Sequence, residues 1–250
     1  MKMLARLSMP LCLCLWELAV RVFHVPPYLL PGPIAIVEAF VNDWRGLVAA
    51  LGVTLAVMLV ALLVSIVVGV GLAATVAASK VARALIHPWA VVLQVTPVVA
   101  IAPLVIIWIG NPFIALVMCA SIVAFFPIFS ATSSGLAAPP PELLDLFHLN
   151  GAKIWQEIFW LRLPAALPLF LSGLRISGGL ALVGAVVAEF VNSTGGGATG
   201  LATRLLESSY RLEIPRMFAC LALLALTGFG INFALGKLES ALLRRFGSIT

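Results

Sequence analysis

The sequence predicts an all-α membrane protein whose chain crosses a bilayer six times. Of its 250 residues, 62% are hydrophobic and only 10% are charged, against roughly 45–50% and 25% in ordinary globular chains. A soluble fold of this size could not cover so much apolar side chain with polar surface. Several charge-free stretches also exceed the roughly 20 residues that a membrane-spanning helix needs. These observations exclude a soluble enzyme, a disordered chain and a nucleic-acid-binding protein, and they predict one transmembrane domain over residues 1–250.

Gaps between charged residues locate the spans in order. The stretch 46–79 carries no charge and predicts one long, tilted helix. The stretch 84–141 is long enough for two helices, which we separate at the turn tripeptide 110–112, Gly-Asn-Pro. We expect Pro97 and Pro103 to kink the first of these two helices. The predicted spans cover residues 7–25, 47–78, 85–109, 113–134, 165–189 and 216–237.

The first span is the least regular of the six. Lys2 and Arg6 precede a short apolar run, which is also the pattern of a signal peptide. No A-x-A cleavage pattern follows, and the apolar residues continue to Val25. We therefore expect a span in which Glu17 and Arg21 face protein or an interface.

Basic residues predict the orientation, because cytoplasmic segments of membrane proteins are enriched in Lys and Arg. With the N-terminus in the cytoplasm, the cytoplasmic segments hold nine basic residues: Lys2, Arg6, Lys80, Arg83, Lys153, Arg162, Lys237, Arg244 and Arg245. The outer segments hold four: Arg45, Arg204, Arg211 and Arg216. We therefore expect both termini in the cytoplasm, a polar cytoplasmic loop over residues 139–164 and a polar outer segment over residues 192–216.

The chain carries no recognisable catalytic or nucleotide-binding motif. It lacks the phosphate-binding pattern G-x-x-x-x-G-K-[ST], and it lacks H-E-x-x-H and G-x-S-x-G. The three histidines are far apart, and the four cysteines lie in apolar stretches without a C-x-x-C pair, so no metal site or disulfide framework is expected. We interpret the glycine run 195–197 as a flexible connector. We therefore predict a chain that is not an enzyme and binds no cofactor itself.

The cytoplasmic loop 139–164 is the most informative part of the sequence. Three prolines end the preceding span, and Glu142 places an acid in the first turn of a new helix. Gly151 interrupts a helical apolar pattern at its middle and allows a bend between two short helices. The apolar positions are Leu143, Phe147, Ile154, Ile158 and Leu161. Such a helix pair either binds a partner or packs on the membrane face of its own bundle.

The spacing within this loop resembles the cytoplasmic signature loop of permease subunits in bacterial ABC importers. In that loop a Glu-Ala-Ala triplet is followed after three residues by Gly. Nine residues later come an aliphatic residue, one further residue and Leu-Pro. Here Asp145, Leu146 and Phe147 occupy the triplet positions, Gly151 follows after three residues, and Leu-Arg-Leu-Pro at 161–164 follows after nine more. Only the triplet departs from the pattern, since Asp replaces Glu and Leu-Phe replaces Ala-Ala.

Other segments resemble the nitrate/sulfonate/taurine branch of these permeases, and the resemblance covers roughly residues 10–246. The matching segments are 26–33, 151–156, 163–168, 173–176 and 182–190. The resemblance implies the type I ABC importer permease fold, with the loop as a coupling helix. It implies a homodimeric pathway in the bacterial inner membrane. Two separate ATPase subunits would bind ATP and Mg²⁺. A periplasmic binding protein would deliver a small nutrient, such as a sulfonate, nitrate, taurine or a pyrimidine-type vitamin precursor.

The resemblance assigns coupling to the loop. The coupling candidates are Glu142, Asp145, Leu146, Phe147, Gly151, Leu161, Leu163 and Pro164. We expect Asp145 to cap a helix end or to pair with a basic residue of the ATPase. We expect a bulky side chain at Gly151 to add steric conflict to lost backbone freedom.

Six residues inside the spans are candidates for the pathway: Gln94, Thr96, Ser121, Arg175, Ser177 and Glu189. The uncharged ones could contact a small ligand or bond a neighbouring helix. Arg175 is costly inside a membrane and such charges are often functional, but a long Arg side chain also reaches the headgroups. Ser177 belongs to a stripe of small residues that packs helices or lines a moving pathway. Glu189 ends the fifth span at its outer face.

An ion-gradient-driven secondary transporter is the alternative function. Such a transporter favours inverted repeats and buried acids. The sequence shows no repeat, and the only acids within the predicted spans are Glu17 and Glu189. An intramembrane enzyme would need a nucleophile and a base, and no such set is apparent.

Overall fold

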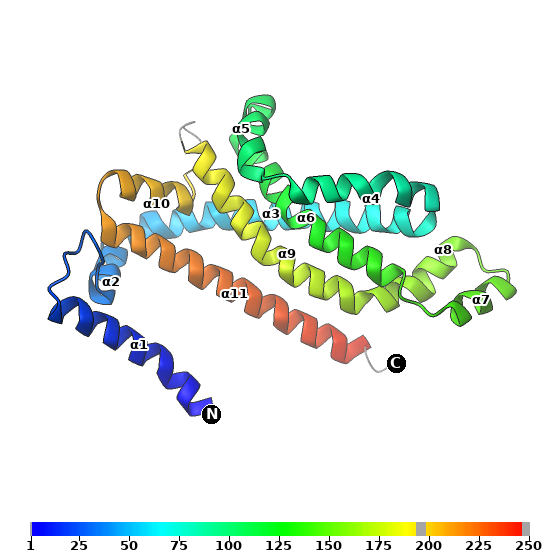
Figure 1. The fold of residues 1–250 in the computed structure, drawn as a ribbon, viewed down its shortest axis with the longest axis horizontal. Helices are drawn as coiled ribbons and strands as arrows, with labels where there is room; N and C mark the ends of the chain where they lie inside the picture. Colours follow the sequence, from blue (N-terminus) through cyan, green and yellow to red (C-terminus); the bar gives the residue numbers. More distant parts are fainter. Residues whose placement is uncertain (1, 194–198, 247–250) are drawn as a thin grey trace. The chain divides into compact units, whose positions relative to one another are not determined.

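The structure is a computed structural model that describes the backbone of residues 2–193 and 199–246 and the side chains of residues 10–193 and 199–244. Over these residues every regular element is a helix (Figure 1). In chain order they are α1 Lys2–Val22, α2 Pro33–Asn42, α3 Trp44–Ala78, α4 Lys80–Val95, α5 Val98–Ile109, α6 Pro112–Leu136, α7 Pro141–Leu149, α8 Ile154–Glu157, the π-helix η1 Ile158–Arg162, α9 Leu163–Asn192, α10 Leu201–Tyr210 and α11 Ile214–Phe246. The predicted connector at 195–197 lies outside the described residues.

The long helices confirm the predicted all-α, multi-span architecture. Within the described residues, four helices are long and apolar enough to cross a membrane. They are α3, α6, the continuous helix Ile154–Asn192 and the segment Ile214–Arg244 of α11. The pair α4 and α5 supplies a fifth if it counts as one broken span.

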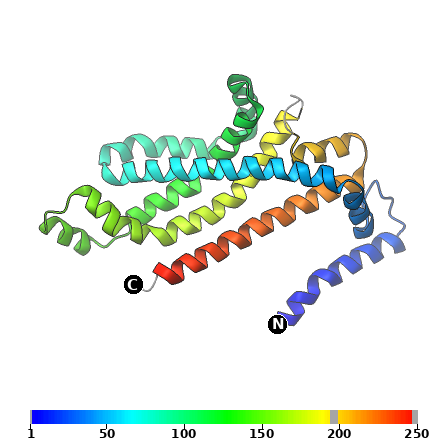
Figure 2. The same cartoon turned by 180° about the vertical axis from the view of Figure 1, so that it is seen from behind.

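The predicted third span, 85–109, is not one straight helix. Its two parts, α4 and α5, are bent by 102°, and the bend is visible from both sides (Figures 1 and 2). Pro97 disfavours the helical conformation at the residue before it, and Thr96 is extended with ψ 121°. The N–H and the hydroxyl of Thr96 both donate to the Val92 carbonyl, at 3.1 and 2.7 Å. The expected kink at Pro97 is therefore a complete break, whereas Pro103 lies inside α5 without ending it.

Three further boundaries differ from the prediction. The short helices α2 and α10 lie outside all predicted spans. The second helix of the cytoplasmic loop is not separate, because α8 continues through η1 into α9. The last helix, α11, continues to Phe246 instead of ending near residue 237.

Contacts group the chain into two units, which are described separately. The first unit comprises residues 1–54 and 198–227. Within it, the Leu201 N–H donates to the Thr54 hydroxyl at 2.8 Å, which fixes the start of α10 against α3. Arg216 forms ion pairs with Asp43 and, at 3.0 Å, with Glu213. The Thr54–Leu201 and Asp43–Arg216 contacts join segments that are far apart in the sequence.

The second unit, residues 55–197 and 228–250, is built around α6 and α9, which pack along each other. Small side chains allow this approach. A Cβ placed at Gly173 would lie 2.6 Å from the Ala131 Cβ and 2.8 Å from the Pro127 carbonyl oxygen. Ala181 and Ala185, from the same stripe, are fully buried. The stripe therefore lies at a helix–helix contact.

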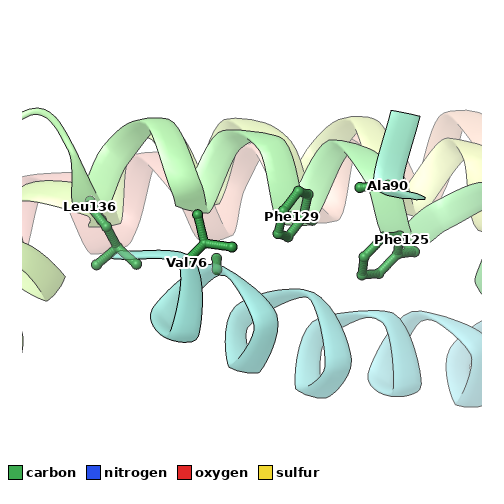
Figure 3. Close-up of a cluster of buried hydrophobic side chains, with 7 residues drawn as sticks. Val76, Ala90, Phe125, Phe129 and Leu136 are labelled. Atoms are coloured by element: carbon green, nitrogen blue, oxygen red, sulfur yellow. The ribbon is translucent and has the colours of Figure 1, made fainter. Parts of the chain in front are cut away.

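A hydrophobic cluster joins α3, α4, α6 and the start of α9 in the second unit (Figure 3). Its buried members are Ala73, Val76, Ala90, Phe125, Phe129, Leu136 and Ala166. The rings of Phe125 and Phe129 stack with centroids 5.5 Å apart. Leu136, the last residue of α6, is fully buried. The end of α6 that leads into the cytoplasmic loop is therefore held firmly by apolar packing.

Candidate coupling loop and translocation cavity

The loop 139–164, predicted to be cytoplasmic, contains α7 and the short helix α8, which continues into α9, at one end of the second unit (Figures 1 and 2). Pro140 precedes α7 and Pro141 occupies its first turn, where a missing N–H costs nothing. Glu142 lies in the same turn, where its negative charge interacts favourably with the positive end of the helix dipole. The sequence thus determines where the first of the two helices begins.

Gly151 ends α7 through a left-handed turn with φ +67°. The Gly151 N–H donates to the His148 carbonyl and the Ala152 N–H donates to the Phe147 carbonyl, both at 3.0 Å. These two bonds form a Schellman motif. The position that Gly151 occupies in this motif needs positive φ, which favours glycine. A Cβ at Gly151 would meet nothing within 4 Å. A substitution at Gly151 therefore strains the backbone of this chain, and the steric conflict expected of a bulky side chain remains a prediction for the docked partner.

Most apolar side chains of the loop are exposed. The exposed fraction is 54% for Leu146 and 85% for Leu149. Leu143, Ile154 and Trp155 are exposed as well. Exposed apolar residues in such a cluster are typical of a surface that binds another protein.

The predicted coupling residues divide into exposed and half-buried positions. Glu142, Asp145, Leu146, Gly151 and Pro164 are exposed, whereas Phe147, Leu161 and Leu163 are half-buried. Asp145 lies in the middle of α7 and accepts no hydrogen bond from the described residues. It therefore does not cap a helix in this chain, and its carboxylate is available to a partner.

An ion pair that the sequence analysis missed holds the loop in place. Glu157 is only 4% exposed. Its Oε1 accepts from Nε of Arg162 at 2.6 Å and lies 2.5 Å from Nη2. Its Oε2 lies 3.3 Å from Nε2 of His148, at the end of α7. Arg162 also donates from Nη1 to the Leu136 carbonyl at 3.1 Å. We call Glu157, Arg162, His148 and the Leu136 carbonyl the loop anchor.

The local π-helix explains the spacing of this pair. Within η1 the backbone bonds to the fifth residue back, as the Leu163 N–H does to the Ile158 carbonyl. Glu157 and Arg162 are five residues apart, so a π turn brings them to the same side of the helix. Opposite charges three or four residues apart are the usual helical signal, and a spacing of five does not give it.

A polar cavity of about 400 Å³ lies beside the loop anchor. Its polar lining comes from the start of α4, the last turns of α6 and the loop: Ser79, Lys80, Arg83, His87, Ser130, Ser133, Ser134, His148, Glu157 and Arg162. The loop anchor therefore lies at a polar edge of the second unit, and not in its apolar core.

A second cavity, of about 350 Å³, lies at the break between α4 and α5. Of the six pathway candidates, Gln94 and Thr96 line it. Ser121 does not, because its hydroxyl donates to the Val117 and Ala61 carbonyls at 2.7 and 3.3 Å. Ser177 is buried and donates to the Ala124 carbonyl at 2.7 Å. The structure thus separates two residues at a cavity from two that join helices.

The charged candidates lie elsewhere in the second unit. Arg175 bridges α9 and α11, since its Nη2 donates to Oδ1 of Asn232 at 2.9 Å. Its Nη1 also lies 3.5 Å from Oε2 of Glu239. Glu189 is 1% exposed, so it is buried within the protein near the end of α9. Among the described residues, no group of three His, Cys, Asp or Glu side chains is placed to hold a metal ion.

Comparison with known proteins identifies the family. Residues 65–244 match the family described as binding-protein-dependent transport system inner membrane component. The chain is 33% identical to the riboflavin transport system permease protein of Chloroflexus aurantiacus, over 95% of this chain and 88% of that protein. It is 33% identical to the formylaminopyrimidine transport permease protein of Halalkalibacterium halodurans, over 92% and 90%. A probable ABC transporter permease protein of Haemophilus influenzae is 31% identical, over 89% of both.

Solved structures share the fold. An inward-facing form of the MetNI methionine ABC transporter matches with a TM-score of 0.67 and 19% identity, covering 80% of this chain and 97% of that one. An amino acid ABC transporter matches with a TM-score of 0.65 and 18% identity, covering 83% and 97%. The family match and the named relatives favour the importer over an ion-gradient-driven transporter. The chain belongs to the binding-protein-dependent transport system inner membrane components and is a permease subunit of an ABC importer.

Proposed function

We propose that two copies of this chain form the translocation pathway of the importer. Each copy crosses the inner membrane six times, with α1 as the first span and the bent pair of α4 and α5 as the third. Both termini lie in the cytoplasm, which the excess of basic residues in the cytoplasmic segments supports. The loop with α7 and α8 then faces the cytoplasm.

The observation that carries this proposal is the geometry of α7. The Gly151 turn directs α7 away from α8, and the helix presents Leu146 and Leu149 in exposed positions. An amphipathic helix of this kind binds by placing its apolar face in a groove of a partner. We infer that α7 docks in a groove of a cytoplasmic ABC ATPase, one loop to each of two ATPase subunits.

The chain itself hydrolyses nothing in this proposal. ATP and Mg²⁺ bind to the ATPase subunits, and their closure moves α7. The loop anchor joins α7 to the end of α6, because Glu157 lies 3.3 Å from His148 of α7 and pairs with Arg162, which donates to the Leu136 carbonyl. The unbroken passage from α8 into α9 joins the loop to a second long helix. Movement of the ATPases would therefore reach both helices of the packed pair.

The solute is a small nutrient delivered by a periplasmic binding protein. Relatives of this chain carry names that refer to riboflavin, formylaminopyrimidine and aliphatic sulfonates. We propose that the solute of this importer belongs to one of these chemical classes, or to the related nitrate and taurine class.

Co-purification with the ATPase tests the proposal. The permease is expressed together with the cytoplasmic ABC ATPase of its importer, and the double variant Leu146→Asp/Leu149→Asp is compared with the unaltered chain. We expect the variant to insert normally and to lose the ATPase. The matched control is Tyr210→Asp, which changes an 81% exposed residue of the proposed outer segment. Equal ATPase recovery with the double variant and the control would refute docking through α7.

A further inference from the structure

The cavity at the break between α4 and α5 lies near the middle of the helix that forms its back wall. Four residues of α6 line it and lie in the central part of the 25-residue helix Pro112–Leu136: Ile122, Val123, Phe126 and Pro127. The remaining walls come from Leu93, Gln94, Thr96, Val98 and Val99 at the break and from Leu180, Val183, Gly184 and Val187 of α9. If α6 crosses the membrane, the cavity lies deep within the hydrocarbon region.

A broken helix at that depth needs a reason. In the hydrocarbon core, non-helical backbone is tolerated only where it is buried in protein or lines a polar cavity. In transporters, interrupted helices near the midplane commonly mark the place where the solute binds. Here the break at Thr96 and Pro97 coincides with a cavity of about 350 Å³, which is in the size range of small-molecule sites, roughly 300–1,000 Å³.

The lining of this cavity selects against charge. Its polar side chains are the amide of Gln94 and the hydroxyl of Thr96, and none of the described lining residues is charged. Burying an anion there without a cation would be strongly unfavourable. The basic candidate within the spans, Arg175, is bound to Asn232 and Glu239 and does not line the cavity.

The same lining suits a flat, uncharged ring. Phe126 supplies an aromatic side chain, and valine and leucine side chains surround it. No described residue hydrogen-bonds the Gln94 amide, whose side chain is exposed. An amide offers both a donor and an acceptor, which matches the alternating nitrogen and amine groups at the edge of a nitrogen heterocycle.

We propose that this cavity is a solute site for an uncharged nitrogen heterocycle of about pyrimidine size, and that the transported solute is not a sulfonate or nitrate. Gln94 positions the ring through its amide, and the apolar walls hold its faces. This proposal rests on the proposed transport function and narrows its solute class.

Binding to the permease–ATPase complex, without the binding protein, tests the cavity directly. The probes are radiolabelled formylaminopyrimidine and taurine, measured by equilibrium dialysis. We expect the pyrimidine to bind and taurine not to bind. Gln94→Leu should weaken pyrimidine binding about tenfold, because the ring loses one hydrogen-bonding partner. Val183→Trp, which fills the cavity, should abolish binding, because Val183 lines it and is 54% exposed.

The matched control is Val95→Trp, which introduces the same bulk next to Gln94. Val95 is 71% exposed but does not line the cavity, so this variant should bind the probe normally. Binding of taurine, unchanged pyrimidine binding by Gln94→Leu, or no pyrimidine binding by the unaltered complex would overturn the proposal. ATPase recovery is recorded in the same preparations. If the unaltered permease does not co-purify with the ATPase, the proposed transport function is refuted. Binding of the pyrimidine probe to the permease alone would then still test whether the cavity is a solute site.

Discussion

Arg162 contacts Glu157 through Nε at 2.6 Å and Nη2 at 2.5 Å, and it reaches the carbonyl of Leu136 with Nη1 at 3.1 Å. One guanidinium thus joins the cytoplasmic loop to the end of α6, at the point where η1 leads into α9. Glu157 is nearly buried, so the pair is shielded from solvent and fixed in geometry. In the proposed importer this contact makes the loop and the two packed helices move together.

Removing the carboxylate should loosen the loop. Glu157→Ala leaves Arg162 without its buried partner, and breaking such a pair destabilises by about 3–5 kcal/mol. We expect a lower unfolding temperature in detergent and reduced ATPase recovery. The control is Lys153→Ala, which changes an exposed residue of the same loop that forms no ion pair with the described residues. Equal unfolding temperatures for the two variants would show that the pair does not hold the loop.

Substitutions of Gly151 should separate backbone strain from docking. Gly151→Ala should destabilise the α7 turn by roughly 1–2 kcal/mol, because alanine disfavours the left-handed conformation, whereas Gly151→Asn should lose less. Hydrogen exchange of the loop amides in the permease alone measures this difference. A Cβ at this position meets nothing within 4 Å. Gly151→Trp should therefore change the hydrogen exchange of the loop in the permease alone about as much as Gly151→Ala does. In the complex, Gly151→Trp should lose far more ATPase binding than Gly151→Ala. Full ATPase binding and full uptake by the tryptophan variant would contradict coupling through this loop.

The contact between α6 and α9 should be sensitive to a single methyl group. Gly173→Ala forces a Cβ to within 2.6 Å of the Ala131 Cβ, and such overpacking typically destabilises by about 1–3 kcal/mol. Gly179→Ala provides the control in the same helix, because its Cβ meets nothing within 4 Å. Thermal unfolding in detergent should place Gly173→Ala below the unaltered chain and Gly179→Ala at or above it. The reverse order would mean that the stripe does not form the packed contact.

Arg175 should act as a link between α9 and α11. Arg175→Ala and Asn232→Ala both remove the hydrogen bonds between these two side chains, worth about 1.5 kcal/mol at the lower end of the range for a charged group, and Arg175→Ala also removes the longer contact with Glu239. The double variant should therefore unfold at nearly the temperature of the worse single variant, because the two changes are not independent. The KM for uptake should stay unchanged in both single variants. Additive destabilisation, or a raised KM for Arg175→Ala alone, would instead indicate a separate role in the pathway.

The long helices were predictable because a long apolar run without charges is typical of a membrane-spanning helix. The run 46–79 forms α3, Trp44–Ala78, and the prolines at 139–141 mark the start of α7. The bend at Gly151 was predictable as well, because a glycine that interrupts a helical apolar pattern is typical of a turn that needs positive φ. These features depend on short-range sequence alone.

The missed features depend on tertiary contacts or unusual local geometry. The break at Thr96 lies within an unbroken apolar run, so charge gaps could not show it, and only Pro97 hinted at a bend. Glu157 and Arg162 were missed because their spacing suits a π turn and not an α-helix. Ser121 and Ser177 gave no signal that distinguishes a helix contact from a pathway, because a serine suits either setting.

Site-directed cross-linking at the end of α7 measures the docking of the loop on the ATPase. Leu149→Cys places a thiol at an 85% exposed position, in a background where Cys12, Cys14, Cys119 and Cys220 are replaced. The matched control is Tyr210→Cys, in the proposed outer segment. We expect the Leu149→Cys permease to cross-link to the ATPase in the assembled complex and the Tyr210→Cys permease not to. Absence of the ATPase cross-link, with labelling of Leu149→Cys by a membrane-impermeant reagent from outside the cell, would contradict coupling through α7.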